Sequence, residues 1–192
     1  MEWCRRASAF MSSIIALLAV TLALAGIATA ATSEGSQASD PTAQLGIWEG
    51  RWTYSEQDYE TPYSHAHTNS GTADCNWSPN KGFMVCDFLN SDPSPGTPVN
   101  DLAIFSYSSA TKTFTRVGVF KETKPFLNQV TIQENTWITS AEIPYQGKTL
   151  IYRDVYVFPP EGKQRTTTVQ ISADKGQTWT TVTQFTAVRV KS

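Results

Sequence analysis

Apolar and polar residues alternate along most of the chain beyond residue 45, as they do in β-strands whose two faces meet different surroundings. The alternation is clearest from Gly46 to Tyr54, where even positions carry Trp48, Trp52 and Tyr54 and the odd positions 49, 51 and 53 carry polar or charged residues. Successive side chains of a strand point to opposite faces, so this stretch predicts a first strand with one aromatic and one charged face. Its two glycines predict that the strand bends.

The same pattern, punctuated by turn residues, continues to the end of the chain. The first strand is predicted to run to about Gln57, and further strands are predicted at His65–Trp77, Phe83–Leu89, Leu102–Tyr107, Thr113–Phe120, Gln129–Gln133, Thr136–Ile143, Lys148–Phe158, Arg165–Ser172 and Thr178–Val190. Polar, proline-containing loops are predicted at 58–64 and 90–100. About ten strands joined mostly by short loops favour an all-β, up-and-down antiparallel β-barrel, with a β-sandwich as the alternative.

The N-terminal region is organised differently. Arg5 and Arg6 precede a continuous apolar run, and Ala28-Thr29-Ala30 provides a small-x-small cleavage site. These features predict an export signal at 1–30, although an uncleaved membrane anchor is the competing interpretation. Residues 31–44 are small and polar and predict a flexible linker, which leaves 45–192 as the folded domain. We therefore expect a periplasmic or extracellular protein with no stable membrane anchor.

Composition narrows the classes of partner. The chain has 192 residues, of which 17% are charged, and its formal net charge is −2. No basic patch is visible, so nucleic acid is not an expected partner.

Cys75 and Cys86 remain after the signal is removed and flank a predicted hairpin turn. Such a pair in an exported chain favours a disulfide over a metal site, and its short loop predicts a stabilisation of about 2–3 kcal/mol.

Two sequence motifs at the ends of the domain carry a resemblance. Gly46-Ile47-Trp48 resembles the G-x-W motif that opens the first strand of lipocalins and other calycins. In that superfamily the Trp plugs one end of the barrel and an Arg of the last strand packs across it, so the resemblance implies a cation–π pair between Trp48 and Arg189. Residues 45–191 as a whole resemble a bacterial exported lipocalin-like family of unknown function.

The same opening also resembles that of nitrobindin-like haem barrels. Those proteins need an axial His late in the chain, whereas the histidines here, His65 and His67, come early. No haem, and no other cofactor, is therefore predicted. The pair could bind a metal only with a third ligand, for which Asp58 and Glu60 lack diagnostic spacing, so no metal site is predicted.

Ser172-Ala173-Asp174-Lys175-Gly176-Gln177-Thr178-Trp179 resembles an Asp-box, S-x-D-x-G-x-T-W. In this motif the carboxylate accepts backbone N–H bonds within the turn, the Gly adopts a positive φ and the Trp packs beneath. Asp-boxes recur in sialidases, which suggests a carbohydrate-active hydrolase as one alternative function. A propeller needs several copies and this chain has a single convincing one, so structural roles are predicted for Asp174 and Trp179.

Aromatic residues dominate the candidate ligand contacts. A barrel of this size has room for a small ligand, and Arg116, Arg153 or Gln170 could anchor its polar groups. The predicted ligand-binding residues are Trp52, Tyr54, Tyr107, Arg116, Tyr152 and Tyr156. No catalytic residue set is recognised, so a binding protein is favoured over an enzyme.

The sequence thus predicts an exported barrel that binds a small, apolar or aromatic molecule. The alternatives are the hydrolase suggested by the Asp-box and a structural or interaction protein with a filled barrel. Ligand identity and oligomeric state do not follow from the sequence.

Overall fold

The computed structural model describes residues 40–91, 100–120 and 125–191. Within them lie one 3₁₀ helix, η1 (Pro41–Trp48), and ten strands. The strands are β1 (Gly50–Asp58), β2 (His67–Trp77), β3 (Phe83–Asn90), β4 (Asn100–Ser108), β5 (Thr113–Phe120), β6 (Phe126–Gln133), β7 (Thr136–Tyr145), β8 (Lys148–Val157), β9 (Gln164–Ser172) and β10 (Thr180–Arg189). The predicted signal, most of the predicted linker and residues 92–99 lie outside the described residues. No helix among the described residues is long and apolar enough to cross a bilayer.

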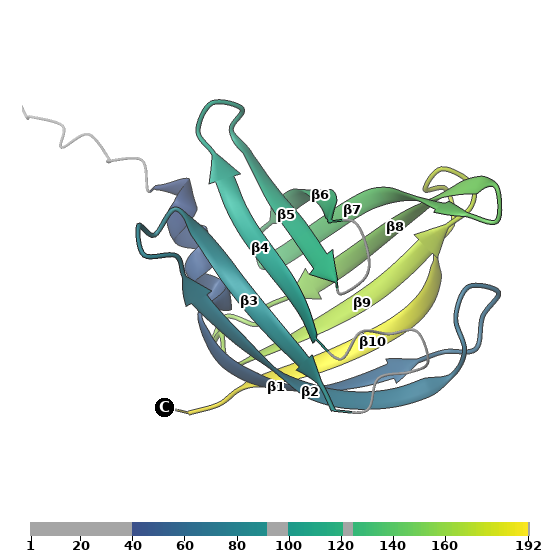
Figure 1. Cartoon of the computed structure of the whole chain (residues 1–192), viewed down its shortest axis with the longest axis horizontal. Coiled ribbons are helices and arrows are strands. Elements are labelled where there is room, and N and C mark those ends of the chain that lie inside the picture. The colour runs from purple at the N-terminus through teal and green to yellow at the C-terminus, as the bar shows by residue number, and fades with distance from the viewer. Residues whose placement is uncertain (1–39, 92–99, 121–124, 192) are drawn as a thin grey trace, which may run out of the picture. The chain divides into compact units, whose positions relative to one another are not determined.

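The ten strands form one closed antiparallel barrel (Figure 1). Each strand pairs with its neighbour in sequence, and β1 pairs with β10 in a register that runs from Trp52 opposite Arg189 to Asp58 opposite Thr183. Closure pairs the first strand with the last and removes the exposed sheet edges that an open sheet would have. The predicted up-and-down barrel is confirmed, and the alternative β-sandwich is wrong.

Residues that alternate between apolar and polar in the sequence point alternately into the barrel and out of it. In β1, Trp52 and Tyr54 are buried while Arg51 and Thr53 are exposed. The period of two therefore places every second residue of each strand in the interior, where it either fills the core or lines a space. Strand bounds agree with the predicted ones to within a few residues, and the largest extension is that of β6, which begins at Phe126 rather than Gln129.

The prediction for residues 46–48 was wrong, because they form the end of η1 rather than the start of a strand. Asp40 precedes the helix and its Oδ1 accepts a hydrogen bond of 2.9 Å from the Thr42 N–H, while Pro41 occupies the first helical position. A capping Asp followed by Pro is a strong helix start, so it overrides the strand pattern that follows. Residues 41–44 consequently belong to the helix and not to a linker.

The helix places an aromatic plug in one end of the barrel. Trp48 is fully buried, and its ring stacks on that of Phe105 with 4.3 Å between centroids. Trp137 and Phe158 meet the same indole edge-on at 5.9 and 5.1 Å. Stacked and T-shaped arrangements of this kind are the favourable geometries for aromatic rings. This end of the interior is therefore filled, and any ligand space must lie beyond it along the strands.

The predicted disulfide is present. Cys75 on β2 lies directly opposite Cys86 on β3 in the strand register, and the two sulfurs are 2.07 Å apart. Both residues are fully buried, so the bond links two strands from inside the barrel. It is a covalent cross-link between neighbouring strands near the plugged end.

Candidate functional site

Beyond the plug the barrel contains a cavity of about 320 Å³. Its walls come from seven of the ten strands, β1, β3, β4, β5, β8, β9 and β10. The lining residues are Tyr54, Glu56, Phe88, Asn90, Asp101, Arg116, Tyr152, Asp154, Tyr156, Arg165, Thr167, Val169, Val182, Thr183, Phe185 and Ala187. A volume at the lower end of typical ligand sites, with mixed aromatic and polar walls, is the geometry expected of a site for one small molecule.

One wall of the cavity is a polar cluster centred on Asp154 of β8. The Asp154 Oδ2 accepts hydrogen bonds from the hydroxyls of Thr139 at 2.9 Å and Tyr156 at 3.0 Å, and Arg116 Nη1 lies 3.4 Å away. The Tyr152 hydroxyl donates to the other carboxylate oxygen, Oδ1. Both oxygens of this buried carboxylate are therefore engaged, which is the arrangement that makes a buried charge tolerable.

The electrostatics of this cluster follow from its burial. Desolvation tends to lower the pKa of Arg116, but the adjacent Tyr156 and Asp154 outweigh it and the pKa is raised. Desolvation raises the pKa of Tyr152 and Tyr156, and the negative charge of Asp154 adds to the rise in both. Both phenols thus stay protonated and act as hydrogen-bond donors at any physiological pH.

A second cluster of hydrogen-bonded side chains lies at another part of the cavity wall. The Tyr54 hydroxyl donates to Asn90 Oδ1 at 2.5 Å, and the Asn69 amide donates to Glu56 Oε2 and to Asn90 Oδ1, both at 3.0 Å. Burial raises the pKa of Glu56 to about 7 and that of Asp101 to about 6. These two carboxyls are therefore partly protonated near neutral pH and can donate as well as accept hydrogen bonds.

The position of Tyr54 depends on a glycine in the neighbouring strand. Gly71 of β2 lies opposite Tyr54, and a Cβ at residue 71 would stand 2.4 Å from the Tyr54 hydroxyl oxygen and 2.3 Å from the Leu89 carbonyl oxygen. Only a residue without a side chain lets the phenol lie across β2 in this way. The ring then meets Phe185 edge-on, with 6.0 Å between centroids, on the cavity wall.

The remaining buried cation, Arg165 of β9, lies where the cavity meets the plug. Its guanidinium carbon is 4.6 Å from the centroid of the Trp48 ring and 5.0 Å from that of Trp52. Desolvation lowers the pKa of Arg165 to about 10, and the charges of Arg116 and Arg189 act in the same direction. Arg165 remains a cation at neutral pH.

The structure brings four of the six predicted ligand contacts to one cavity: Tyr54, Arg116, Tyr152 and Tyr156 line it. Trp52 lies beneath Arg165 in the aromatic floor and is fully buried, rather than lining the cavity. Tyr107 does not line this cavity, because it lies two residues beyond Phe105 on β4, past the plug, where its ring contacts Phe114 with 4.8 Å between centroids. Strand parity alone does not show on which side of a plug a residue lies.

Of the three residues predicted to anchor polar groups of a ligand, one lines the cavity and two do not. Arg116 faces the cavity, whereas Arg153 and Gln170 do not line it. Arg153 Nε donates to Gln170 Oε1 at 2.8 Å, and its guanidinium stacks on Trp179 at 3.6 Å. Arg153 is one residue away from the inward-facing Asp154, so it points to the opposite face of β8.

The guanidinium of Arg189 lies over Trp52, 4.5 Å from the ring centroid, and the cation over Trp48 is Arg165. The predicted cation–π pair of Trp48 with Arg189 is therefore wrong. Arg189 nevertheless holds the backbone on both sides of Trp48. Its Nη2 donates to the Ile47 carbonyl at 2.9 Å and its Nη1 to the Glu49 carbonyl at 2.7 Å. The last strand therefore secures the end of η1 through backbone oxygens.

The Asp-box residues form a self-contained turn between β9 and β10. Asp174 Oδ1 accepts from the Thr178 N–H at 2.9 Å and from the Ser172 hydroxyl at 2.7 Å, and Oδ2 accepts from the Thr178 hydroxyl at 2.6 Å. These bonds, those of Thr178 first, lower the pKa of Asp174 to about 2. Gly176 adopts a φ of +88°. The carboxylate faces its own turn, so the motif offers no support for a glycosidase site.

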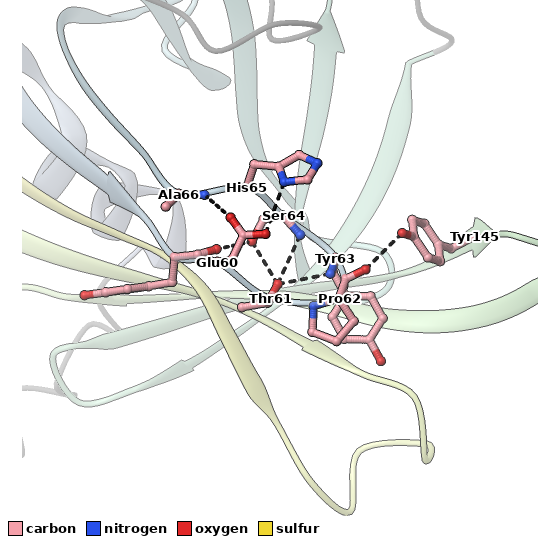
Figure 2. A network of polar contacts seen from close by, with 9 residues as sticks. Glu60, Thr61, Pro62, Tyr63, Ser64, His65, Ala66 and Tyr145 are labelled. Atoms are coloured by element: carbon pink, nitrogen blue, oxygen red, sulfur yellow. Dashed lines mark hydrogen bonds and ion pairs between the residues drawn. The ribbon is translucent and has the colours of Figure 1, made fainter.

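The His65 region forms a pinned loop between β1 and β2 (Figure 2). Thr61 Oγ1 accepts from the N–H groups of Tyr63 and Ser64, both at 3.0 Å, and the Tyr145 hydroxyl donates to the Pro62 carbonyl at 3.1 Å. His65 is exposed and its Nδ1 lies 3.2 Å from Glu60 Oε1.

Glu60 fixes the C-terminal side of that loop. Its Oε2 accepts the Ala66 N–H at 3.0 Å, and this bond, followed by the one to His65, lowers the pKa of the carboxyl. Among the residues described, no three His, Cys, Asp or Glu side chains are arranged to hold a metal ion. The loop is therefore explained by its own hydrogen bonds and its contact with Tyr145.

Sequence reasoning missed the charged members of the site, Glu56, Asp101, Asp154 and Arg165. A signal for three of them was present, since Glu56 shares the parity of Trp52 and Tyr54, Asp154 lies between Tyr152 and Tyr156, and Arg165 shares the parity of Val169 and Ile171. Charged residues on the inward parity of a barrel are costly unless they serve a purpose, so the pattern itself marks them.

A scan of protein-family models and a search of curated proteins return no significant match. Among solved structures, Rv2717c from M. tuberculosis is similar at 12% sequence identity and a TM-score of 0.53, over 79% of this chain and 99% of that one. A protein of unknown function from the DUF3598 family of Nostoc punctiforme aligns over the same shares at 10% identity, with a TM-score of 0.25 that carries no argument. The first likeness shows a shared barrel fold and nothing about activity.

Proposed function

We propose that this protein binds a small, largely apolar or aromatic molecule inside its barrel. The observation that carries the proposal is the cavity of about 320 Å³ beyond the aromatic plug. Rings of Tyr54, Phe88 and Phe185 supply an apolar surface, while a few buried polar groups are available to orient a ligand. This combination of apolar walls and sparse, fixed polar groups is characteristic of small-molecule sites.

The surroundings of the cavity also support a site that exists before the ligand arrives. Asp154 ties together side chains from three strands through Arg116, Thr139 and Tyr156. On the other side, Asn90 joins Tyr54 of β1 to Asn69 of β2. Side chains held in this way lose little further freedom on binding, which favours affinity.

Binding is tested with N-phenyl-1-naphthylamine, a neutral probe whose fluorescence increases in apolar sites. Val169 lines the cavity, so Val169→Phe should fill part of it and weaken probe binding by about tenfold or more. Val157 is exposed on the outside of β8, and Val157→Phe is the matched control. The control should bind the probe as the wild-type protein does.

Loss of probe binding in Val169→Phe with an unchanged unfolding temperature would support an interior site. Equal binding by both variants would place the probe elsewhere and contradict the proposal. Native mass spectrometry of the protein purified from its source supplies an independent test. A mass adduct that Val169→Phe does not retain would identify a natural ligand of the same cavity.

The proposal includes export, which rests on the predicted signal at 1–30 and on the disulfide between Cys75 and Cys86. Disulfides persist in oxidising compartments, so this cross-link suits a periplasmic or extracellular location. Determination of the N-terminus of the protein from its natural source tests this. A chain that begins at Ala31 supports cleavage, and one that retains residues 1–30 contradicts it.

A second candidate, an acid–base enzyme, is favoured by one specific observation. Glu56 and Asp101 line the same cavity, and burial raises the pKa of both carboxyls, to about 7 and about 6. Carboxyls with pKa values near neutrality are suited to general acid–base catalysis. Hydrolysis of a panel of nitrophenyl glycosides that Glu56→Gln and Asp101→Asn each abolish would favour the enzyme over a pure binding protein.

A further inference from the structure

Arg165 is a buried cation of the cavity wall with no ion-pair partner among the described residues. It projects from β9 and only 4% of its surface is exposed. The faces of Trp48 and Trp52 lie beside it, and the cavity opens above it. The two indoles offset part of the cost of burying the cation, but they accept no conventional hydrogen bond from its N–H groups.

The N–H groups of Arg165 are not matched by acceptors. Its buried Nε and Nη1 have no hydrogen-bond partner among the described residues. Nor does any carboxylate of those residues lie within ion-pair distance of this guanidinium. A buried cation with unpaired donors costs several kcal/mol, so its presence on the wall of a cavity calls for a partner from outside the chain.

One acid of the cavity wall, Asp154, is already engaged by other side chains. It pairs with Arg116 and accepts from Thr139, Tyr152 and Tyr156. Arg116 also has an unpaired Nε, but its charge is compensated by this carboxylate. The ion pair is neutral as a unit, which leaves the charge of Arg165 uncompensated.

The other two acids of the wall are not placed to neutralise Arg165. The carboxyl of Glu56 is directed to Asn69, from which it accepts a hydrogen bond of 3.0 Å. Asp101 interacts electrostatically with Arg116, Asp87 and Asp154. The floor of the cavity is therefore electropositive.

The geometry points to an organic anion as the ligand class: a compact aromatic or apolar carboxylate whose carboxylate group pairs with the Arg165 guanidinium. A guanidinium attracts a carboxylate through charge-assisted N–H bonds, and Arg165 lines the cavity without an ion-pair partner among the described residues. The inference rests on the proposed function, since it names the chemistry of the molecule that fills the same cavity.

The remainder of the cavity suits the apolar body of such a ligand. Above Arg165 the walls carry Tyr54, Phe185, Val169 and Val182. The volume of about 320 Å³ equals that of roughly ten water molecules, so a compact body of two or three rings fits. An anionic head at the floor and a short ring system above it together match the distribution of charge in the cavity.

The test compares 2-naphthoate with its neutral analogue 2-naphthamide as competitors of N-phenyl-1-naphthylamine at neutral pH. The wild-type protein should prefer the carboxylate by about tenfold or more. Arg165→Gln should lose that preference while still binding the neutral probe, and Arg165→Lys should keep part of it. Arg153→Gln removes an arginine that does not line the cavity and should behave as the wild type.

The outcomes separate the two proposals. Probe binding without any preference for naphthoate, or a preference that survives in Arg165→Gln, overturns the anion proposal and leaves the binding proposal intact. No binding of the probe or of either competitor by the wild type refutes the proposed function itself. If Arg165→Gln does not fold, the wild-type arginine Nε–H resonances decide. Naphthoate, and not naphthamide, should shift a resonance that is missing in Arg165→Lys.

Discussion

The guanidinium carbon of Arg165 lies 4.6 Å from the centroid of the Trp48 ring, in the place where the calycin resemblance implied Arg189. This relationship divides the interior into two parts. Below the guanidinium the rings of η1, β1 and β4 fill the barrel, and above it the cavity begins. The residue that closes the plug is therefore also the floor of the candidate site.

Because Arg165 is buried at this position without an ion pair, we predict that it lowers the free energy of unfolding of the empty protein. Replacement by Met keeps a long apolar stem against Trp48 and Trp52 and removes the unpaired donors. Arg165→Met should therefore stabilise the empty protein by about 1–3 kcal/mol. Urea unfolding in the absence of ligand measures the effect. Arg153→Met, which loses the contact with Trp179 and the hydrogen bond to Gln170 outside the cavity, is the control and should not stabilise. A less stable Arg165→Met would show that the guanidinium itself supports the plug.

The disulfide predicts a second effect on stability. Cys75 and Cys86 are 11 residues apart, and the cross-link restricts that short loop in the unfolded chain. Replacing both by Ala should lower the free energy of unfolding by about 2–3 kcal/mol. Urea unfolding with and without dithiothreitol tests this. The wild-type protein should become less stable on reduction and the double variant should not respond to the reagent.

The sequence was sufficient to predict the fold because alternation and turn residues are local signals. Inward and outward residues of β1 and β9 follow from the period of two. The failure at Gly46–Trp48 was local as well, since Asp40 and Pro41 were present to indicate a helix start. The G-x-W resemblance favoured a strand, whereas the Asp-Pro pair before it favoured a helix, and the helix forms.

The site was predictable only in part, for a different reason. Parity places Tyr54, Arg116 and Tyr156 in the interior, but it gives no height along the barrel axis. That height separates Tyr54, which lines the cavity, from Tyr107 beyond the plug. Whether Arg165 finds a carboxylate partner depends on which carboxylates reach which cations, and that depends on register across several strands rather than on any local pattern.

Weakening the Asp-box turn is predicted to have a local effect and to leave ligand binding unchanged. Asp174→Asn weakens the acceptors for Thr178 and Ser172, so the turn should open more readily. Trypsin cleavage after the exposed Lys175 should accelerate, while N-phenyl-1-naphthylamine binds as before. The carboxyl of Asp174 has a lowered pKa of about 2, so its contribution is present above its ordinary pKa and is lost as pH falls towards 2. Loss of probe binding in this variant would contradict a purely structural turn.

The raised pKa of Glu56 predicts that the free energy of unfolding decreases as pH rises. Burial raises its pKa from 4.5 to about 7, aided by the nearby Asp58 and Asp101 and opposed by Asn69 and His67. The folded protein then binds more protons than the unfolded chain between these values, so stability is full below about pH 4.5 and falls through about pH 7. Because the side chain is partly exposed, the loss should be about 1–2 kcal/mol. Glu56→Gln should reduce the decline in urea unfolding, whereas Glu161→Gln, in an exposed turn, should not.

The same titration predicts how the affinity for an organic anion depends on pH. With Glu56 and Asp101 protonated, the cavity holds the neutral Arg116–Asp154 pair and the cation of Arg165. As pH rises through about 6 and about 7 the two carboxyls ionise and add negative charge to the walls. The affinity for 2-naphthoate should therefore fall, by about tenfold between pH 5.5 and pH 8.5, since like charges in a low-dielectric cavity repel strongly.

Three comparisons isolate the cause of that fall. 2-Naphthamide carries no charge, so its affinity should change little over the same range. Glu56→Gln should retain more of its naphthoate affinity at high pH than the wild type, because one of the two titrating carboxyls is gone. Naphthoate itself stays ionised throughout, as a carboxylic acid with an ordinary pKa near 4. An affinity that is flat with pH, or that falls equally for the amide, would show that the walls do not gain charge facing the ligand.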